Sequence, residues 1–100
     1  DCLAGHPAVA LAAVVGKPDP LRTEIVKAYV RLAPGHTGTP ELAEAIRAHV
    51  RNRLSAHEYP REIDFVEEIP LTTSGKVIRR FFRQRASAEA AEEQARRHWE

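Results

Sequence analysis

The chain has 100 residues, of which 43% are hydrophobic and 29% charged, and its formal net charge is +1. The length suits one compact domain, and the composition excludes a disordered tail and a strongly basic nucleic-acid binder. Cys2 is the only cysteine, which excludes an internal disulfide and a thiolate metal cluster and favours a reducing compartment, the cytoplasm by default. No apolar run reaches the roughly 18 residues that a membrane-spanning helix needs, so no membrane partner is expected.

The first third of the chain predicts the end of a helix followed by two strands. Gly5 and Pro7 are typical of a helix end, so residues 1–5 are interpreted as a last helical turn. The apolar run from Ala8 to Val15 predicts a buried strand. From Glu24 to Ala33 apolar and polar side chains alternate, which predicts a second strand, antiparallel to the first and covered on one face. The face left uncovered would carry Lys27, Tyr29 and Arg31.

A helix and a third strand follow. Thr39-Pro40-Glu41 combines an N-cap, a proline at the first helical position and an acid in the first turn. Apolar side chains then recur every four residues, so one stripe should face the sheet until the helix ends near Ser55. The stripe consists of Leu42, Ile46, Val50 and Leu54. Tyr59-Pro60 favours extended backbone leading into a third strand over Glu62 to Glu68.

The last third predicts a polar loop and helical structure. Lys76 lies at the end of the loop, and the apolar spacing from Val77 to Arg83 predicts an amphipathic helix. Residues 87–100 are rich in helix-forming residues, with Trp99 as the only large apolar anchor. The expected fold is therefore α+β, a small sheet of about three strands packed with helices, with a domain over residues 1–86 and a helical tail over 87–100.

The segment Pro70-Leu71-Thr72-Thr73-Ser74-Gly75-Lys76-Val77-Ile78-Arg79-Arg80 resembles the C-terminal signature of the adenylate-forming superfamily, which includes acyl-CoA synthetases, luciferases and peptide-synthetase adenylation domains. Residues 5–9, 15–19 and 59–66 match further family segments in order and approximate spacing. Acetyl-, medium-chain and aromatic acyl-CoA synthetases are the most similar. The resemblance implies the mobile C-terminal lid of an enzyme that uses ATP with Mg²⁺ and coenzyme A to activate a carboxylic acid through an acyl-adenylate.

The large N-terminal adenylation domain, which holds the ATP and acyl pockets in this superfamily, has no counterpart in the sequence. The chain also begins abruptly without a methionine, which suggests an excised fragment. We therefore expect the fragment to be inactive alone, to bind none of these substrates tightly, and to have its own adenylation domain as its main partner.

The resemblance also assigns roles to four residues. Lys76 matches the family's catalytic lysine, whose cation offsets the repulsion between a carboxylate and the α-phosphate. Gly75 supports the loop, because it lets the backbone approach a ligand. Arg51 matches an arginine that meets the phosphates of coenzyme A, and Tyr59 a tyrosine beside the same nucleotide. A solvated helix arginine and a tyrosine that packs at a strand entry stay open as alternatives.

The pattern Pro-x-x-x-x-Gly-Lys from Pro70 to Lys76 is one that protein lysine acetyltransferases read in several acyl-CoA synthetases. The resemblance thus implies Lys76 as an acetylation site, with an acetyltransferase and a deacetylase as partners. Acetylation removes the lysine charge, so loss of adenylation would follow.

Other interpretations of the same residues are weaker. A nucleotide P-loop is rejected, because no glycine lies five residues before Gly75 and Val77 takes the place of the Ser or Thr that binds magnesium. The five histidines show no metal-ligand spacing, so no metal site is expected. The arginines near residue 80 alternate with Phe81 and Phe82 at helical spacing, which favours packed phenylalanines and solvated arginines over a nucleic-acid surface. A freestanding protein-interaction or nucleotide-binding module stays open as the alternative function.

Overall fold

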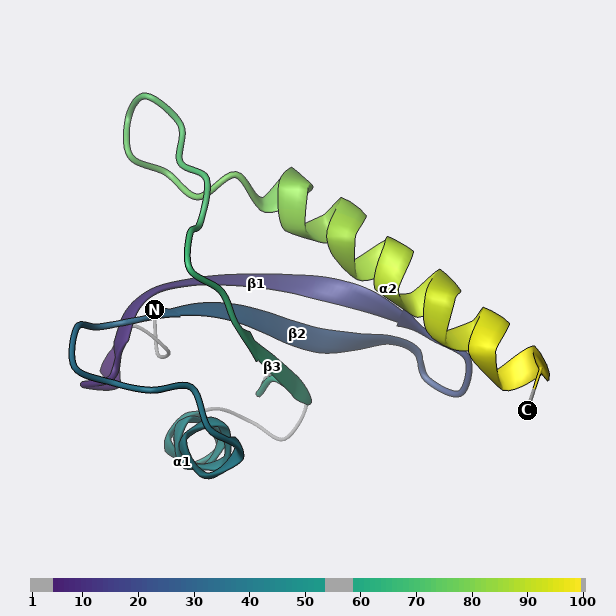
Figure 1. Ribbon diagram of the computed structural model, residues 1–100, viewed down its shortest axis with the longest axis horizontal. Coiled ribbons are helices and arrows are strands. Elements are labelled where there is room, and N and C mark those ends of the chain that lie inside the picture. The colour runs from purple at the N-terminus through teal and green to yellow at the C-terminus, as the bar shows by residue number, and fades with distance from the viewer. Residues whose placement is uncertain (1–4, 54–58, 100) are drawn as a thin grey trace.

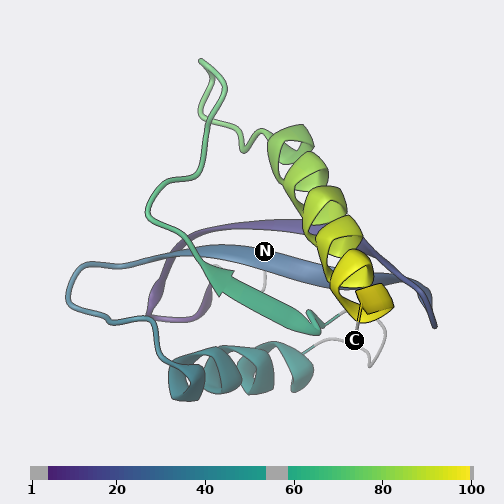
Figure 2. The same cartoon turned by 45° about the vertical axis from the view of Figure 1, so that its right-hand side comes forward.

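The computed structural model describes residues 5–53 and 59–99, the last three by their backbone alone. The described elements follow in the order β1 (Val9–Asp19), β2 (Thr23–Leu32), α1 (Pro40–Arg51), β3 (Glu62–Phe65) and α2 (Arg79–Trp99). One sheet with the strand order β1-β2-β3 separates the two helices, which lie on opposite faces (Figures 1 and 2). The α+β fold class is thus confirmed. The helix end predicted over residues 1–5 lies almost wholly outside the described residues, as do Cys2, Leu54 and the Trp99 side chain.

The first two strands pair antiparallel, as predicted, in a register that runs from Val9 opposite Leu32 to Asp19 opposite Thr23. The predicted end of the first strand at Val15 is wrong, because β1 continues to Asp19. Its last residues include Pro18, which cannot donate a ladder hydrogen bond. Proline is tolerated there because β1 lies at the edge of the sheet, where one side needs no partner.

The third strand lies parallel to β2, to which it is joined through the crossover helix α1. It ends at Phe65, earlier than the predicted Glu68. The Val66 amide still donates to the Val30 carbonyl at 2.9 Å, and the chain then leaves the sheet. It must do so because Ile69, 6% exposed, packs on the opposite face, beneath α2.

Thr39 caps α1 as predicted, and its Oγ1 accepts a hydrogen bond from the Leu42 amide at 3.1 Å. The helix ends at Arg51 instead of near Ser55. The Arg53 amide bonds the Val50 carbonyl three residues back, at 3.0 Å, and this tighter turn closes the helix. The apolar stripe buries Ile46 and Val50 against β1 and β2, in a cluster formed by Val9, Ala28, Val30, Ile46 and Val50.

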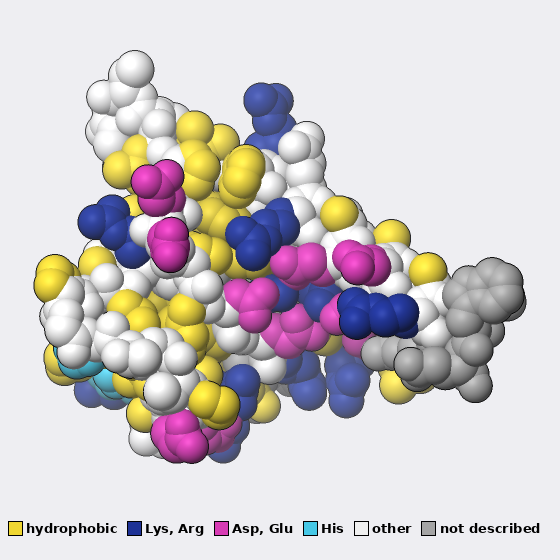
Figure 3. Space-filling model, in the orientation of Figure 1, with side chains coloured by type: hydrophobic (Ala, Val, Ile, Leu, Met, Phe, Trp, Pro, Cys, Tyr) yellow, Lys and Arg dark blue, Asp and Glu magenta, His cyan; other side chains and the backbone are white. Residues whose placement is uncertain are grey.

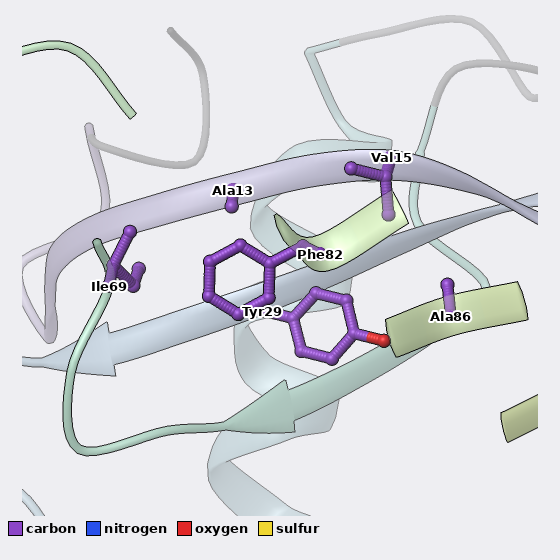
Figure 4. Packing of buried hydrophobic residues seen from close by; sticks show 6 residues of the cluster. All are labelled: Ala13, Val15, Tyr29, Ile69, Phe82 and Ala86. Atoms are coloured by element: carbon purple, nitrogen blue, oxygen red, sulfur yellow. The ribbon is translucent and has the colours of Figure 1, made fainter. Parts of the chain in front are cut away.

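Both faces of β2 are covered, so the prediction of one covered face is wrong. Lys27 is 3% exposed and Tyr29 is fully buried, although sequence alternation places both on the uncovered face. The second cluster lies beneath α2, where the Tyr29 and Phe82 rings stack with their centroids 4.6 Å apart (Figure 4). It comprises Ala13, Val15, Tyr29, Ile69, Phe82 and Ala86.

Helix α2 is one continuous helix of 21 residues that runs through the predicted tail. It begins at Arg79, because Val77 forms an antiparallel bridge with Leu71 and is held in the preceding loop. Of the two phenylalanines predicted to pack, Phe82 is fully buried, whereas Phe81 is 48% exposed. None of the described helices combines the length and apolar character needed to cross a membrane.

Ion pairs hold the second half of α2 against the sheet. Glu93 lies 2.7 Å from Lys17 Nζ, and Glu89 lies 2.5 Å from Lys27 Nζ. On the sheet side, Glu62 pairs with Lys17 at 2.9 Å. Figure 3 shows acidic and basic side chains gathered between β3 and α2, the region in which these ion pairs lie. The tail therefore has polar anchors in addition to buried Ala90, and sequence reasoning missed them.

Candidate functional site

Lys76 lies on a hairpin loop between β3 and α2 that projects from the body of the domain, on the side away from α1 (Figures 1 and 2). An antiparallel bridge between Leu71 and Val77 closes the loop. One step nearer the body of the domain, the Ile78 amide donates to the Pro70 carbonyl at 3.0 Å. The partly buried Val77 packs against the second cluster, so the base of the loop is fixed to the core.

Gly75 has the conformation that this loop requires. Its φ of +84° lies in the left-handed region, and its amide donates to the Thr72 carbonyl at 2.9 Å. A four-residue turn followed by a left-handed glycine is a common hairpin loop. A Cβ at this position would meet nothing within 4 Å, so backbone conformation selects glycine, and crowding does not. Close approach to a ligand stays a prediction.

The Lys76 side chain is exposed and forms no ion pair with any residue in the described part of the chain. Arg79 and Arg80, on the first turn of α2, are also exposed. This end of the molecule therefore presents cations to solvent, without a carboxylate partner among the described residues. Such an arrangement is suited to contact with phosphate or carboxylate groups of a ligand or of another domain.

The structure brings together the two residues that were predicted to bind coenzyme A. Arg51 is the last residue of α1, and its guanidinium carbon lies 5.0 Å from the centroid of the Tyr59 ring. This distance suits a cation–π contact, which orients the guanidinium while leaving its N–H groups free to donate. Tyr59 also packs on the cluster beneath α1. Arg51 and Tyr59 thus belong to the α1 side of the domain, apart from the Lys76 loop.

Thr72 is a residue of this loop to which the sequence analysis gave no role. Its Oγ1 accepts a hydrogen bond from the Lys76 amide at 3.0 Å, and its own amide donates to the Lys76 carbonyl at 2.7 Å. A threonine near a left-handed glycine is a weak sequence signal, because hydroxyl groups often bond nearby backbone in turns. Among the described residues, no group of three or more His, Cys, Asp or Glu side chains is arranged to hold a metal ion.

Residues 1–76 match the protein family described as the AMP-binding enzyme C-terminal domain. The chain belongs to this family. It is 50% identical over 78 residues to acetyl-coenzyme A synthetase of Bacillus subtilis strain 168, a match that covers 78% of the chain and 14% of that enzyme. It is 51% identical over 80 residues to 4-hydroxybutyrate–CoA ligase 1 of Metallosphaera sedula, which covers 80% of the chain and 14% of the ligase.

Solved structures agree with this assignment. A crystal structure of an acyl-CoA synthetase from Brucella canis matches with a TM-score of 0.81 and 59% identity, covering 93% of the chain and 16% of the synthetase. The anthranilate–CoA ligase AuaEII, in complex with anthranoyl-AMP, matches with a TM-score of 0.83 and 38% identity, over 90% of the chain and 17% of the ligase. The chain therefore corresponds to the C-terminal domain of AMP-forming acyl-CoA synthetases and spans about one seventh of their length.

Proposed function

We propose that this domain is the lid of an AMP-forming acyl-CoA synthetase and that Lys76 supplies the cation for acyl-adenylate formation. The observation that carries the proposal is an exposed lysine on a fixed, hydrogen-bonded loop in a chain of this family. Adenylation with ATP and Mg²⁺ brings a carboxylate against the α-phosphate, and an ammonium group between them stabilises the developing charge. Because the ATP and acyl pockets belong to the adenylation domain in this superfamily, the isolated domain should be inactive.

Arg51 and Tyr59 are proposed to contact the nucleotide of coenzyme A in the second half-reaction. Support comes from their mutual contact, which presents a guanidinium held over an aromatic ring. They lie on the α1 side, whereas Lys76 projects on the other side (Figure 1). The two regions would face a single active site more readily in turn than together. The placement therefore favours rotation of the lid between adenylation and thioester formation.

Lys76 is also the proposed site of lysine acetylation, with a protein acetyltransferase and a deacetylase as partners. The chain has two other lysines, Lys17 and Lys27, which are 2% and 3% exposed and engaged in ion pairs. Lys76 is the lysine that an enzyme can reach without opening the fold. The cytoplasm stays the expected location, on the basis of the single cysteine.

The proposal is tested by half-reactions of the full-length enzyme that contains this domain. Lys76→Ala should lower ATP–pyrophosphate exchange by about a thousandfold, because the lost group stabilises the transition state directly. Thioester formation from supplied acyl-adenylate should change far less. Arg83→Ala, which removes an exposed cation of α2, serves as the control and should leave both rates near wild type. Equal loss in both half-reactions of Lys76→Ala would remove the assigned role.

The coenzyme A contact has its own arm of this experiment. Arg51→Ala should raise the KM for coenzyme A by about tenfold, because a charge-assisted phosphate contact is lost, and should spare pyrophosphate exchange. An unchanged KM would make Arg51 a solvated helix arginine.

A further inference from the structure

Thr72 takes part in the hydrogen bonds that shape the tip of the loop that carries Lys76. Thr72 bonds Lys76 on both sides of its Cα atom: the Lys76 amide donates to Thr72 Oγ1 at 3.0 Å, and the Thr72 amide donates to the Lys76 carbonyl at 2.7 Å. The Thr72 carbonyl accepts from the Gly75 amide at 2.9 Å, and Oγ1 lies 3.0 Å from Ser74 Oγ. The bonds of Thr72 thus span the whole tip of the loop.

The Thr72 hydroxyl accepts a hydrogen bond that the backbone of Thr72 does not accept. The Thr72 carbonyl accepts from the Gly75 amide, whereas the Lys76 amide donates to the side-chain Oγ1 of Thr72. A hydroxyl can accept this bond and donate to Ser74 at the same time. With both flanking peptide groups bonded, the direction of the Lys76 Cα–Cβ bond is set relative to the Leu71–Val77 bridge.

We propose that Thr72 is a positioning residue for Lys76: its hydroxyl fixes the backbone from which the lysine reaches the reacting groups. The inference rests on the proposed role of Lys76 in adenylation. Thr72 is itself exposed, and its proposed role requires no contact with a reacting atom. Its effect should therefore fall on the rate of the adenylation step, while substrate binding and thioester formation stay close to wild type.

The test uses two substitutions that separate the hydroxyl from the shape of the side chain. Thr72→Val keeps the branched shape and deletes Oγ1, whereas Thr72→Ser keeps the hydroxyl. Thr73→Val is the matched control, since the Thr73 side chain is exposed and forms no hydrogen bond with any described residue. In the full-length enzyme, Thr72→Val should lower kcat for pyrophosphate exchange about tenfold with little change in KM. Thr72→Ser should restore kcat to within about threefold of wild type, and Thr73→Val should match wild type.

A second measurement tests the hydrogen bonding of the loop without relying on catalysis. In the 100-residue chain, Thr72→Val should speed hydrogen exchange of the Lys76 amide several-fold, and Thr73→Val should not. Unchanged exchange of that amide would overturn the inference, as would equal kinetic losses in Thr72→Val and Thr72→Ser. Wild-type kcat in Thr72→Val, together with an inactive Lys76→Ala, would overturn the positioning role alone. Wild-type pyrophosphate exchange in Lys76→Ala would overturn the proposed function and this inference with it.

Discussion

The three lysines of this chain occupy two contrasting environments. Lys76 projects from a loop, exposed and without an ion pair among the described residues, while Lys17 and Lys27 are buried between the sheet and α2. Lys27 lies 2.8 Å from Asp64 and 2.5 Å from Glu89, and Lys17 lies close to Glu62 and Glu93. The same side chain thus serves as a free cation in one region and as a cross-link in the other.

Electrostatics explains why the buried lysines stay charged. Burial by itself lowers the pKa of Lys27, but hydrogen bonds to Asp64 and Glu89 outweigh this effect and raise its pKa. Burial likewise favours a raised pKa at Glu89, yet the bonds from Lys27 and Tyr29 leave its pKa lowered. Burial and the bond to Glu89 raise the pKa of Tyr29 to about 12, so it stays a neutral donor. The network is therefore a set of satisfied charges, which anchors α2 to the sheet.

The largest contrast between the two environments should appear in chemical access. When the 100-residue chain is incubated with a protein lysine acetyltransferase and acetyl-CoA, Lys76→Arg should reduce total labelling by about tenfold or more, because Lys17 and Lys27 react only after local opening. Mass spectrometry of peptides locates the acetyl groups. As a control, acetic anhydride applied to the urea-unfolded chain should label all three lysines. Undiminished enzymatic labelling of Lys76→Arg would show that the buried lysines are accessible.

The second contrast concerns stability. Lys27→Met should lower the free energy of unfolding by about 2 to 3 kcal/mol, because it leaves Asp64 without its cation and Glu89 with Arg85 as its remaining cation, at 3.3 Å. The partial exposure of both carboxylates keeps the cost below that of a fully buried pair. The same substitution at the exposed Lys76 should change the free energy by less than about 0.5 kcal/mol. Urea unfolding of both variants of the 100-residue chain measures the difference. A loss at Lys27 as small as the loss expected at Lys76 would mean that the buried network contributes no stability.

The loop could be predicted from sequence because its determinants are local. Gly75 and the polar residues before Lys76 indicate a turn, and the Thr39-Pro40 pair likewise fixes the start of α1. The burial of Lys27 and Tyr29 could not be predicted, because it depends on α2, whose Glu89 lies 62 residues further along the chain. Alternation shows which residues share a face, but it does not show what covers that face. A lysine on a strand predicts a solvent-exposed position unless carboxylates from distant parts of the sequence are known to pair with it.

Dependence on residues distant in the sequence also explains why the contacts that anchor the tail could not be predicted. Residues 87–100 offer few large apolar side chains, so a sequence argument finds little to hold them. Their contacts instead come from small buried alanines and from glutamates at i and i+4, Glu89 and Glu93, whose partners lie on different strands. On sequence alone these glutamates are indistinguishable from the solvated glutamates of any exposed helix.

The smallest expected effect is a pH dependence specific to the buried network. Because the pKa of Glu89 is lower in the folded chain than its usual 4.5, the folded state binds fewer protons than the unfolded state as the pH falls below about 5. The stability contributed by Glu89 is therefore fully present above that range and is lost as the pH falls through its folded pKa. The stability contributed by Lys27 depends on pH in the opposite direction, because its pKa is raised in the folded chain. This contribution is present below about pH 10.5 and is lost only in strong alkali.

Glu89→Gln isolates the loss of stability at acid pH that Glu89 causes. The amide of the glutamine can still accept hydrogen bonds from Lys27 and Tyr29, but it cannot titrate. Thermal unfolding between pH 3 and 7 should show a shallower loss of midpoint temperature in this variant than in wild type. The titration of His6 must be separated from this effect. Burial, then the neighbouring His49 and His36, lower the pKa of His6 below 6.5. The stability contributed by neutral His6 is therefore lost as the pH falls below about 6.5, a loss that begins at a higher pH than that of Glu89. Glu92→Gln, an exposed glutamate on the same helix, should follow the wild-type curve. Parallel curves for Glu89→Gln and wild type below pH 5 would mean that the contact between Glu89 and Lys27 does not hold α2 in solution.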